Sequence, residues 1–227
     1  MAYRIAINGF GRIGRSILRA LYESTDYPSL QIVAINDLAN IETLAHLTRY
    51  DSTHGRFLGT VEVEKASGDL LVSGDRIAVS QISDLSALPW RGLAVDLVME
   101  CSGAFTDRAQ AECHLQAGAR RVLFSQPAES DVDATLVYGI NHELLSAAAS
   151  IVSNASCTTN CIVPVLRALD QSFGVLSGVI TTIHSAMNDQ PVIDSYHDSD
   201  LRKTRSAMQS IIPVSYTHLR AHETSPY

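Results

Sequence analysis

The stretch NGFGRIG at residues 8–14 decides the fold that the sequence predicts. It matches the pattern G-x-G-x-x-G and lies between an apolar run at 3–8 and a segment at 12–22 whose apolar residues recur at helical spacing. Glycines at these positions let the backbone approach a pyrophosphate, whose negative charge then faces the positive end of the helix dipole. The motif predicts a dinucleotide site at this strand-to-helix turn, against the alternative of an ordinary glycine turn.

Short apolar runs alternate with helical stretches along the chain, which predicts parallel βαβ units in an α/β fold. We expect a domain boundary near Ser153. The predicted strands lie at residues 3–8, 31–36, 95–101, 122–125, 151–153 and 178–184. The predicted helices lie at residues 12–22, 107–117 and 159–173.

The composition is typical of a soluble globular protein. Hydrophobic residues make up 46% of the 227 residues and charged residues 18%, and the formal net charge is -7. This balance excludes a disordered chain and gives no basic surplus for binding nucleic acid. No apolar run reaches the roughly 18 residues of a membrane helix, and no export leader precedes the first strand. We therefore expect a cytoplasmic protein whose four cysteines are thiols.

Asp37 follows the second predicted strand at the distance where an acidic side chain accepts hydrogen bonds from the adenosine ribose. A carboxylate there repels a 2′-phosphate, so the sequence favours NAD over NADP as the cofactor. His46 and His54 have neither metal-ligand spacing nor cysteine partners. We expect ordinary surface or loop histidines at these two positions and no metal site.

A second chemical signal is SNASCTTNC at residues 153–161, where Cys157 stands just before an apolar-periodic helix. A free cysteine has a pKa of about 8.5, and a helix N-terminus stabilises its thiolate, which is the nucleophilic form. The alternative for Cys157 is a small buried hydrophobe. Cys161, one helical turn later, is the better candidate for that buried role. The spacing C-x-x-x-C without a second pair does not predict zinc.

The segments at 8–15 and 155–161 together resemble the glyceraldehyde-3-phosphate dehydrogenase family. Within that family the chain most resembles the bacterial erythrose-4-phosphate dehydrogenases, and the likeness extends from about residue 2 to Val214. The segments that carry this second resemblance are LPWR at 88–91, FSQP at 124–127, DATLVYG at 133–139 and HSAMNDQ at 184–190.

The resemblance implies NAD-dependent oxidation of a phosphorylated sugar aldehyde. Cys157 would attack the aldehyde carbon, and His184 would take the hydroxyl proton of the thiohemiacetal as hydride leaves for NAD, which gives a thioester. The backbone N–H of Cys157 and the side chain of Thr158 would stabilise the oxyanion. The implied cofactor residues are Gly9, Phe10, Gly11, Arg12, Ile13, Asp37, Ser102, Gly103 and Ser125. The implied substrate residues are Ser156, Cys157, Thr158, Lys203 and Arg205.

Two departures from the phosphorylating members of the family bear on the fate of the thioester. Met187 stands where those members carry a phosphate-binding threonine, and a thioether cannot donate a hydrogen bond. Lys203 replaces an arginine in the basic run at 201–205, which weakens bidentate anion recognition, although a solvated loop is the alternative for this run. We therefore expect water as the acyl acceptor and 4-phosphoerythronate as the product, a step that feeds pyridoxal phosphate synthesis in bacteria.

The resemblance also divides the chain. Residues 1–153 correspond to a Rossmann-type NAD-binding domain with a doubly wound parallel sheet, and 154–214 to the incomplete start of an α+β catalytic domain. Residues 215–227 show neither periodicity nor family likeness, and we expect a foreign tail after a truncation.

A catalytic segment of that length cannot bury its own core, so we expect little activity from the chain as printed. The family forms homotetramers. From the composition we expect no nucleic-acid partner and no membrane partner. Two alternatives stay open: a phosphorylating triose-phosphate dehydrogenase and an inactive NAD-binding module.

Overall fold

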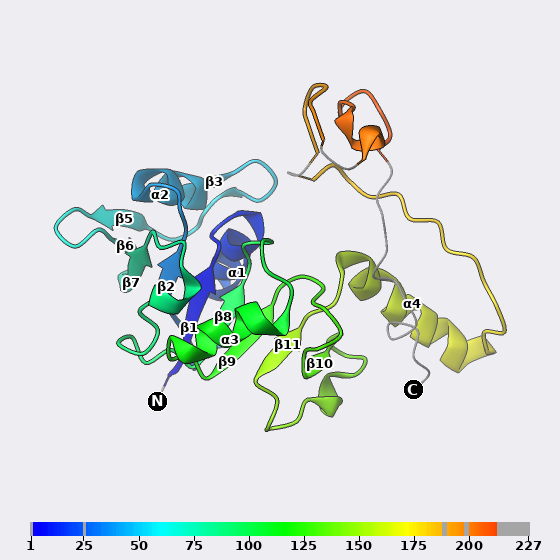
Figure 1. Ribbon diagram of the computed structural model, residues 1–227, viewed down its shortest axis with the longest axis horizontal. Coiled ribbons are helices and arrows are strands. Elements are labelled where there is room, and N and C mark those ends of the chain that lie inside the picture. The colour runs from blue at the N-terminus through cyan, green and yellow to red at the C-terminus, as the bar shows by residue number, and fades with distance from the viewer. Residues whose placement is uncertain (1, 25, 188–189, 198–199, 213–227) are drawn as a thin grey trace. The chain divides into compact units, whose positions relative to one another are not determined.

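The computed structural model describes residues 2–24, 26–187, 190–197 and 200–212, and it divides the chain into two compact units (Figure 1). The first unit is Met1–Asn160 and the second is Cys161–Tyr227. The elements of the described chain are β1 Tyr3–Asn8, α1 Arg12–Glu23, β2 Leu30–Asn36, α2 Ile41–Arg49, β3 Tyr50–Asp51, β4 Gly55–Arg56, β5 Val61–Glu64, β6 Asp69–Val72, β7 Asp75–Ser80, η1 Leu85–Ala87, β8 Leu97–Glu100, α3 Arg108–Gln116, β9 Arg121–Phe124, β10 Ala134–Thr135, η2 His142–Leu144, β11 Ile151–Ser153, α4 Cys157–Phe173 and η3 Leu201–Thr204.

The first unit is built on a nine-stranded sheet in the order β10-β11-β9-β8-β1-β2-β7-β6-β5. The strands from β10 to β7 pair in parallel, and β6 and β5 extend that edge as antiparallel strands. The chain runs outward from β1 to β2 and β7, then returns to β8 on the other side of β1. This reversal is the topological switch point of a doubly wound sheet, and ligands bind outside the carboxyl ends of the strands there.

Successive side chains of the sheet pack into two hydrophobic cores on opposite faces. Ile5 and Ile7 of β1 lie in one core with Leu18 of α1 and Leu44 of α2. Ala6, between them in sequence, lies in the other core with Trp90 and Val98. Alternation of neighbouring residues between two buried faces explains why the parallel strands are continuous apolar runs. The predicted Rossmann-type fold is confirmed for this unit.

Most predicted elements of the first unit agree with the structure. The strands predicted at 3–8 and 151–153 have those bounds, and the helix predicted at 12–22 is α1. The run predicted as a strand at 95–101 is a strand over Leu97–Glu100. Asp96 and Cys101 flank this strand and donate backbone hydrogen bonds to the carbonyl oxygens of Arg4 and Asn8 in β1. The antiparallel strands β5 and β6 are not among the predicted elements.

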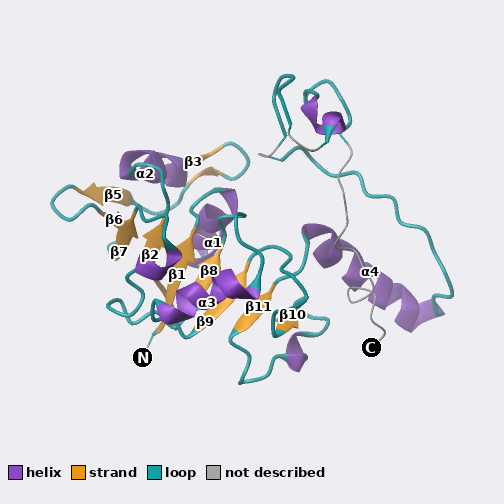
Figure 2. Ribbon diagram, in the orientation of Figure 1, coloured by secondary structure: helices purple, strands orange, loops and turns teal. Residues whose placement is uncertain are grey.

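The second unit differs from the prediction. The expected helix at 159–173 is present within α4, but no strand forms at 178–184, and Figure 2 shows 174–187 as loop. A strand needs a neighbour for its backbone hydrogen bonds, and 178–184 pairs with no described strand. Val179 and Ile183 are exposed there. Every described residue of the buried hydrophobic core lies at or before Ala155.

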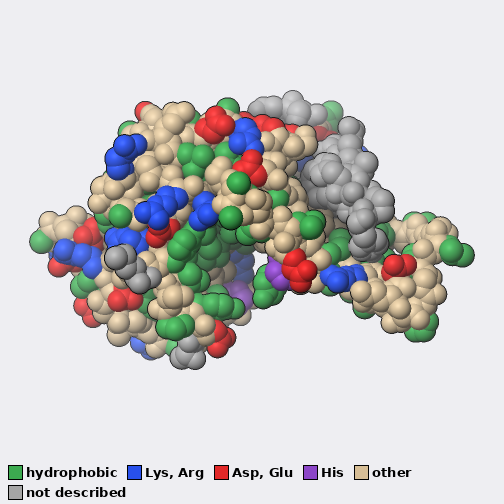
Figure 3. All heavy atoms as spheres, turned by 90° about the horizontal axis from the view of Figure 1, so that it is seen from below, with side chains coloured by type: hydrophobic (Ala, Val, Ile, Leu, Met, Phe, Trp, Pro, Cys, Tyr) green, Lys and Arg blue, Asp and Glu red, His purple; other side chains and the backbone are tan. Residues whose placement is uncertain are grey.

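The surface of the described chain carries charged side chains of both signs. On the face shown in Figure 3, acidic and basic side chains are interspersed, in keeping with ion pairs such as that of Arg76 with Glu64 and Asp69. No helix in the described ranges has both the length and the apolar character needed to cross a membrane. Residues 215–227, for which a foreign tail is expected, lie outside the described residues.

Two glycines of the 8–14 motif are required by close packing at the switch point. Gly9 has φ +86°, and a Cβ added there would lie 2.4 Å from the backbone Cα and N of Ser102. A Cβ on Gly14 would lie 2.4 Å from the carbonyl oxygen of Gly9. The chain at the end of β1 therefore approaches both α1 and the chain beyond β8 more closely than any side chain allows.

Replacing Gly9 by alanine is expected to lower the free energy of unfolding by roughly 3 kcal/mol, because it combines positive φ with a backbone clash. Gly11→Ala is the matched control, since a Cβ at Gly11 meets no atom within 4 Å. Its expected cost stays within about 1 kcal/mol. Urea denaturation followed by circular dichroism measures both. Equal stability losses for the two variants would show that the contact between Gly9 and Ser102 does not constrain the fold.

Candidate cofactor and catalytic site

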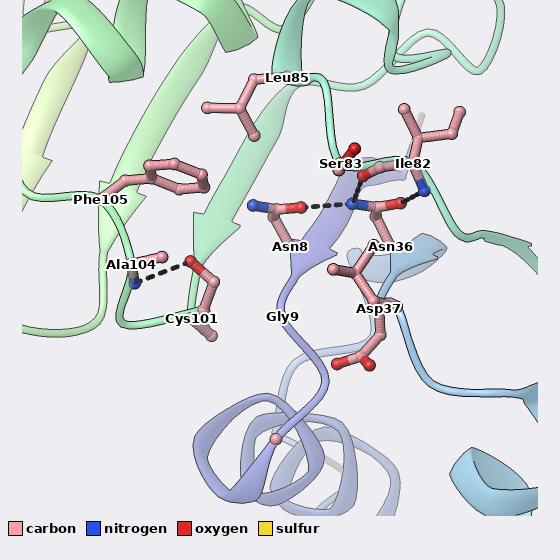
Figure 4. A pocket seen from close by; sticks show the side chains of 13 residues that line it. Asn8, Gly9, Asn36, Asp37, Ile82, Ser83, Leu85, Cys101, Ala104 and Phe105 are labelled. Atoms are coloured by element: carbon pink, nitrogen blue, oxygen red, sulfur yellow. Dashed lines mark hydrogen bonds between the residues drawn. The ribbon is translucent and has the colours of Figure 1, made fainter. Parts of the chain in front are cut away.

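A pocket of about 430 Å³ opens at the carboxyl ends of β1, β2 and β8, where the strand order reverses (Figure 4). Its polar lining comes from strand ends and the turns that follow them. Its apolar lining comes from the segments after β2, β7 and β8. The lining residues are Asn8, Gly9, Gly11, Asn36, Asp37, Leu38, Ile82, Ser83, Leu85, Cys101, Ser102, Ala104 and Phe105.

The glycine-rich turn brings the N-terminus of α1 to this pocket. Gly11 is the N-cap residue, and no side chain caps the helix there, so its first N–H groups suit an anion. Open space beside Gly11, where a Cβ would meet nothing within 4 Å, leaves room for that anion. Phe10 is fully buried in the core, whereas Arg12 and Ile13 are exposed at the first turn of α1. A pyrophosphate at these predicted loop residues stays a prediction.

Asp37 lies at the end of β2, in the pocket and beside the glycine-rich turn (Figure 4). Its Oδ2 accepts a hydrogen bond from the backbone N–H of Phe10 at 2.7 Å, and its Oδ1 accepts one from the N–H of Ala39 at 2.9 Å. Each carboxylate oxygen can accept more than one hydrogen bond, so both retain capacity for ribose hydroxyls. Asp37 is therefore held in place by the same turn that would hold the pyrophosphate.

The apolar side of the pocket was not predicted from the sequence. Leu38, Ile82, Leu85 and Phe105 line it, and in Figure 4 the Phe105 ring and the Leu85 side chain face the same space. Such a wall beside the carboxylate of Asp37 would suit a flat aromatic base. These four residues lie in segments without apolar periodicity, and no motif singled them out.

The remaining predicted cofactor residues follow β8 and β9. Ser102 lines the pocket, Gly103 adopts φ +73°, and Ser125 follows the last residue of β9. Cys101 lies among them, and burial raises the pKa of its thiol to about 12, against a hydrogen bond from Ser125 that lowers it. The Cys101 thiol is therefore protonated at neutral pH, unlike a thiol that serves as a nucleophile.

Cys157 is the first residue of α4 and is exposed. Ser156 accepts a hydrogen bond from the N–H of Thr159 at 2.9 Å, which is the contact of an N-cap side chain. The preceding residue, Ala155, has φ +58°, a conformation that costs a non-glycine residue energy and is found at functional sites. A strained turn thus places the predicted nucleophile at a helix N-terminus.

The turn before Cys157 is fixed from several sides. The hydroxyl of Ser153 donates to the carbonyl oxygen of Gln126 at 2.9 Å and accepts from the N–H of Ala155. The side-chain amide of Asn160 donates to the carbonyl oxygen of Asn154 at 2.7 Å. Thr158, predicted to assist the oxyanion, is buried beside Cys157. The first turn of α4 is therefore held rigidly by side chains of the first unit.

The prediction that Cys161 is buried is wrong, because the residue is exposed. The described residues of the second unit supply no buried hydrophobic core that could cover it. His184 also belongs to the second unit, where its Nδ1 lies 2.7 Å from the carbonyl oxygen of Ser185. The pairing of His184 with Cys157 stays a prediction, since the two residues belong to different units.

The basic run at 201–205 contains η3, and both of its arginines are paired with carboxylates. Arg205 contacts Asp194 at 2.6 Å, and Arg202 contacts Asp200 at 2.8 Å. A hydrogen bond from Arg202 is the main cause that lowers the pKa of Asp200 to about 2. Lys203 is half-buried within η3. A phosphate at Lys203 and Arg205 stays a prediction.

Two family models match the chain. "Glyceraldehyde 3-phosphate dehydrogenase, NAD binding domain" matches residues 3–108, and "Glyceraldehyde 3-phosphate dehydrogenase, C-terminal domain" matches residues 156–224. The second match continues past Val214 into the segment expected to be foreign. Together the two matches cover well over half of the chain, and the first includes both the glycine-rich turn and Asp37. The chain therefore belongs to the glyceraldehyde-3-phosphate dehydrogenase family and contains its NAD-binding domain.

Proposed function

We propose that this protein oxidises erythrose 4-phosphate to 4-phosphoerythronate with NAD, and that water releases the product from a cysteine thioester. The observation that carries the proposal is Cys157, an exposed thiol at the N-terminus of α4 in a family of NAD-dependent aldehyde dehydrogenases. From the family resemblance we also propose that the protein is a cytoplasmic homotetramer. Its product would feed pyridoxal phosphate synthesis in bacteria.

The cofactor lies, in this proposal, along the carboxyl edge of the sheet. Ile82, Leu85 and Phe105 of the apolar wall would pack against its adenine, and Asp37 would accept hydrogen bonds from its adenosine ribose. The N-terminus of α1, beside Gly11, would hold its pyrophosphate. The carboxylate of Asp37 repels a 2′-phosphate, which favours NAD over NADP.

The chemistry begins at Cys157, whose thiolate forms a bond to the aldehyde carbon and gives a thiohemiacetal. The N–H of Cys157 and the side chain of Thr158 stabilise the oxyanion that this addition forms. Once that oxygen has taken up a proton to become the thiohemiacetal hydroxyl, His184 accepts the hydroxyl proton as hydride leaves the same carbon. Bound NAD supplies the hydride acceptor for this oxidation. The product of the step is a thioester on Cys157. Water adds to its carbonyl carbon and gives up one proton to solvent. The C–S bond then breaks, the carboxylic acid leaves, and the thiolate is restored.

The choice of water over inorganic phosphate rests on Met187 and the run at 201–205. Met187 offers no hydrogen-bond donor to a second anion. Lys203 binds an anion as a point charge, and Arg205 already contacts Asp194 at 2.6 Å. An acyl acceptor that needs no anion site is therefore favoured.

The selectivity for NAD should depend on Asp37. We expect Asp37→Ala to raise the Kd for NAD by about tenfold and to narrow the ratio of the NADP to the NAD dissociation constants. Isothermal titration calorimetry with each cofactor measures this ratio. Asp69→Ala is the matched control, because Asp69 pairs with Arg76 outside the pocket and its loss should leave both constants unchanged. Equal affinity for NAD and NADP in the unmodified chain would contradict the proposal.

The nucleophile can be identified by alkylation, because Cys157 and Cys161 are both exposed on α4 and lie at different distances from the helix N-terminus. We expect iodoacetamide at pH 7 to label Cys157 at least about tenfold faster than Cys161. Cys101, with its pKa raised to about 12, should react slowest. Mass spectrometry of digested samples gives the three rates. Cys161→Ser is the control and should leave the labelling rate of Cys157 unchanged. Faster labelling of Cys161 than of Cys157 would show that the assignment of Cys157 as the nucleophile is wrong.

The substrate and acyl acceptor are decided by one assay. NADH formation is followed with erythrose 4-phosphate and with glyceraldehyde 3-phosphate, each in phosphate-free buffer and after phosphate addition. We expect turnover of erythrose 4-phosphate without added phosphate, and none for Cys157→Ser. Residues 1–227 and the full product of the gene are assayed side by side, and we expect the activity in the latter. Strict phosphate dependence with preference for the triose would assign the protein to the phosphorylating branch.

A further inference from the structure

Buried polar side chains form a continuous hydrogen-bonded chain just beneath the cofactor pocket. It crosses four neighbouring strand ends, from Ser80 of β7 through Asn36 of β2 and Asn8 of β1 to Glu100 of β8. Figure 4 shows the amides of Asn36 and Asn8 in line at the edge of the pocket. Neither the glycine-rich motif nor the Cys157 chemistry explains why Glu100, a fully buried carboxyl group, lies at the end of this chain.

The direction of the hydrogen bonds is fixed at the β2 end by a backbone donor. The N–H of Ile82 donates to Oδ1 of Asn36 at 2.9 Å, so the other side-chain atom of Asn36 is its NH₂ group. That group donates to Oδ1 of Asn8 at 2.8 Å. The NH₂ group of Asn8 must then point the other way, and it donates to Oε2 of Glu100 at 2.6 Å.

The direction is fixed independently at the opposite end by Trp90. Its indole N–H can only donate, and it donates to Nδ1 of His114 at 3.0 Å. His114 is buried in α3, and with Nδ1 as acceptor its proton lies on Nε2. Nε2 lies 3.1 Å from Oε2 of Glu100 and therefore donates to it.

Both series of donors converge on Glu100. Its other oxygen, Oε1, accepts from the N–H of Ser102 at 2.8 Å and from the Ser102 hydroxyl. The hydroxyl oxygen in turn accepts from the N–H of Ala104 at 3.2 Å. Two amides, an imidazole and a hydroxyl are thus placed to donate to this one carboxyl group. Glu100 is therefore a buried carboxylate held by four donors.

The two bonds from Ser102 connect this carboxylate to the wall of the pocket. Ser102 lines the pocket, and its backbone is the one that a Cβ on Gly9 would meet at 2.4 Å. The position of Ser102 therefore determines the separation between the turns that follow β1 and β8. Through the bond from Ala104, it also fixes the start of the segment that carries Phe105.

We propose that Glu100 is a positioning residue for the cofactor: its buried carboxylate holds Ser102 against Gly9 and so keeps the cleft at the width that the dinucleotide requires. Glu100 touches no cofactor atom in this account, and it acts through Ser102. The inference rests on NAD binding in this cleft.

Glu100→Gln tests the role, because the glutamine has the same shape but turns one acceptor oxygen into an NH₂ donor. Either orientation sets that group against at least one donor that cannot reverse, the N–H of Ser102 or the Nε2–H of His114. We expect the Kd for NAD of the whole chain to rise about tenfold, measured by calorimetry at a temperature where circular dichroism shows the variant folded. Glu112→Gln on the exposed side of α3 is the matched control and should stay within about twofold.

A double-mutant cycle with Ser102→Ala separates positioning from general support of the fold. If Glu100 acts through Ser102, Glu100→Gln should raise the Kd for NAD by a smaller factor in the Ser102→Ala background than in the unmodified chain. If the two residues act independently, the double variant should raise the Kd by the product of the two single-variant factors. Ser102→Ala removes the hydroxyl bond to Glu100 and keeps the bond from the backbone N–H, so the effect should shrink without vanishing. Multiplying effects would overturn the part assigned to the Ser102 hydroxyl, and an unchanged NAD affinity in Glu100→Gln would overturn the whole proposal. Absence of NAD binding by the unmodified chain would instead overturn the cofactor site itself.

A second measurement applies even if Glu100→Gln does not fold. Trp90 is the only tryptophan of the sequence, so its indole N–H gives one signal in a ¹⁵N spectrum of the unmodified chain. Histidine-labelled protein should show His114, identified by its contact with that indole proton, with its proton on Nε2 and none on Nδ1. A proton on Nδ1 would reverse the hydrogen bonds toward Glu100 and overturn the proposal.

Discussion

The close approach of two backbones, at Gly9 and at Ser102, is the constraint on which the rest of the structure depends. It holds the ends of β1 and β8 together where the chain reverses its direction across the sheet. Because no side chain fits between them, the floor of the cleft consists of main chain and of the short polar side chains Asn8 and Asn36. The same approach brings the N-terminus of α1 to the cleft, since Gly14 packs its backbone on the carbonyl group of Gly9.

Much of the first unit could be predicted because two periodicities in the sequence are strong. Apolar runs identified β1 and β11 to the residue, and helical spacing identified α1 within one residue of its end. The glycine pattern and Asp37 located the cofactor cleft. The apolar wall with Phe105 could not be predicted, because it comes from irregular segments that only the fold brings together. The same holds for Glu100, whose buried charge is explained only by partners from β1 and α3.

The second unit shows the limit of pattern-based prediction. The helical spacing at 159–173 is local, and α4 forms as expected. The apolar segment at 178–184 is rich in residues that favour β-strands. That preference does not supply the neighbouring strand with which the segment must pair. The exposure of Cys161 has the same origin, since burial requires a second layer that a sequence motif does not describe.

The fixed amide of Asn8 has a consequence for the chemical ageing of the protein. Asn8 precedes Gly9, and an asparagine–glycine sequence deamidates when the following backbone nitrogen attacks the side-chain carbonyl carbon. In the folded chain the N–H of Gly9 donates to the carbonyl oxygen of Asn36 at 2.8 Å, and the Asn8 amide is bonded at both ends. The fold thus shields a reactive dipeptide. The unfolded chain, which lacks these hydrogen bonds, is therefore the state in which Asn8 deamidates. Deamidation would place a second carboxylate beside Glu100.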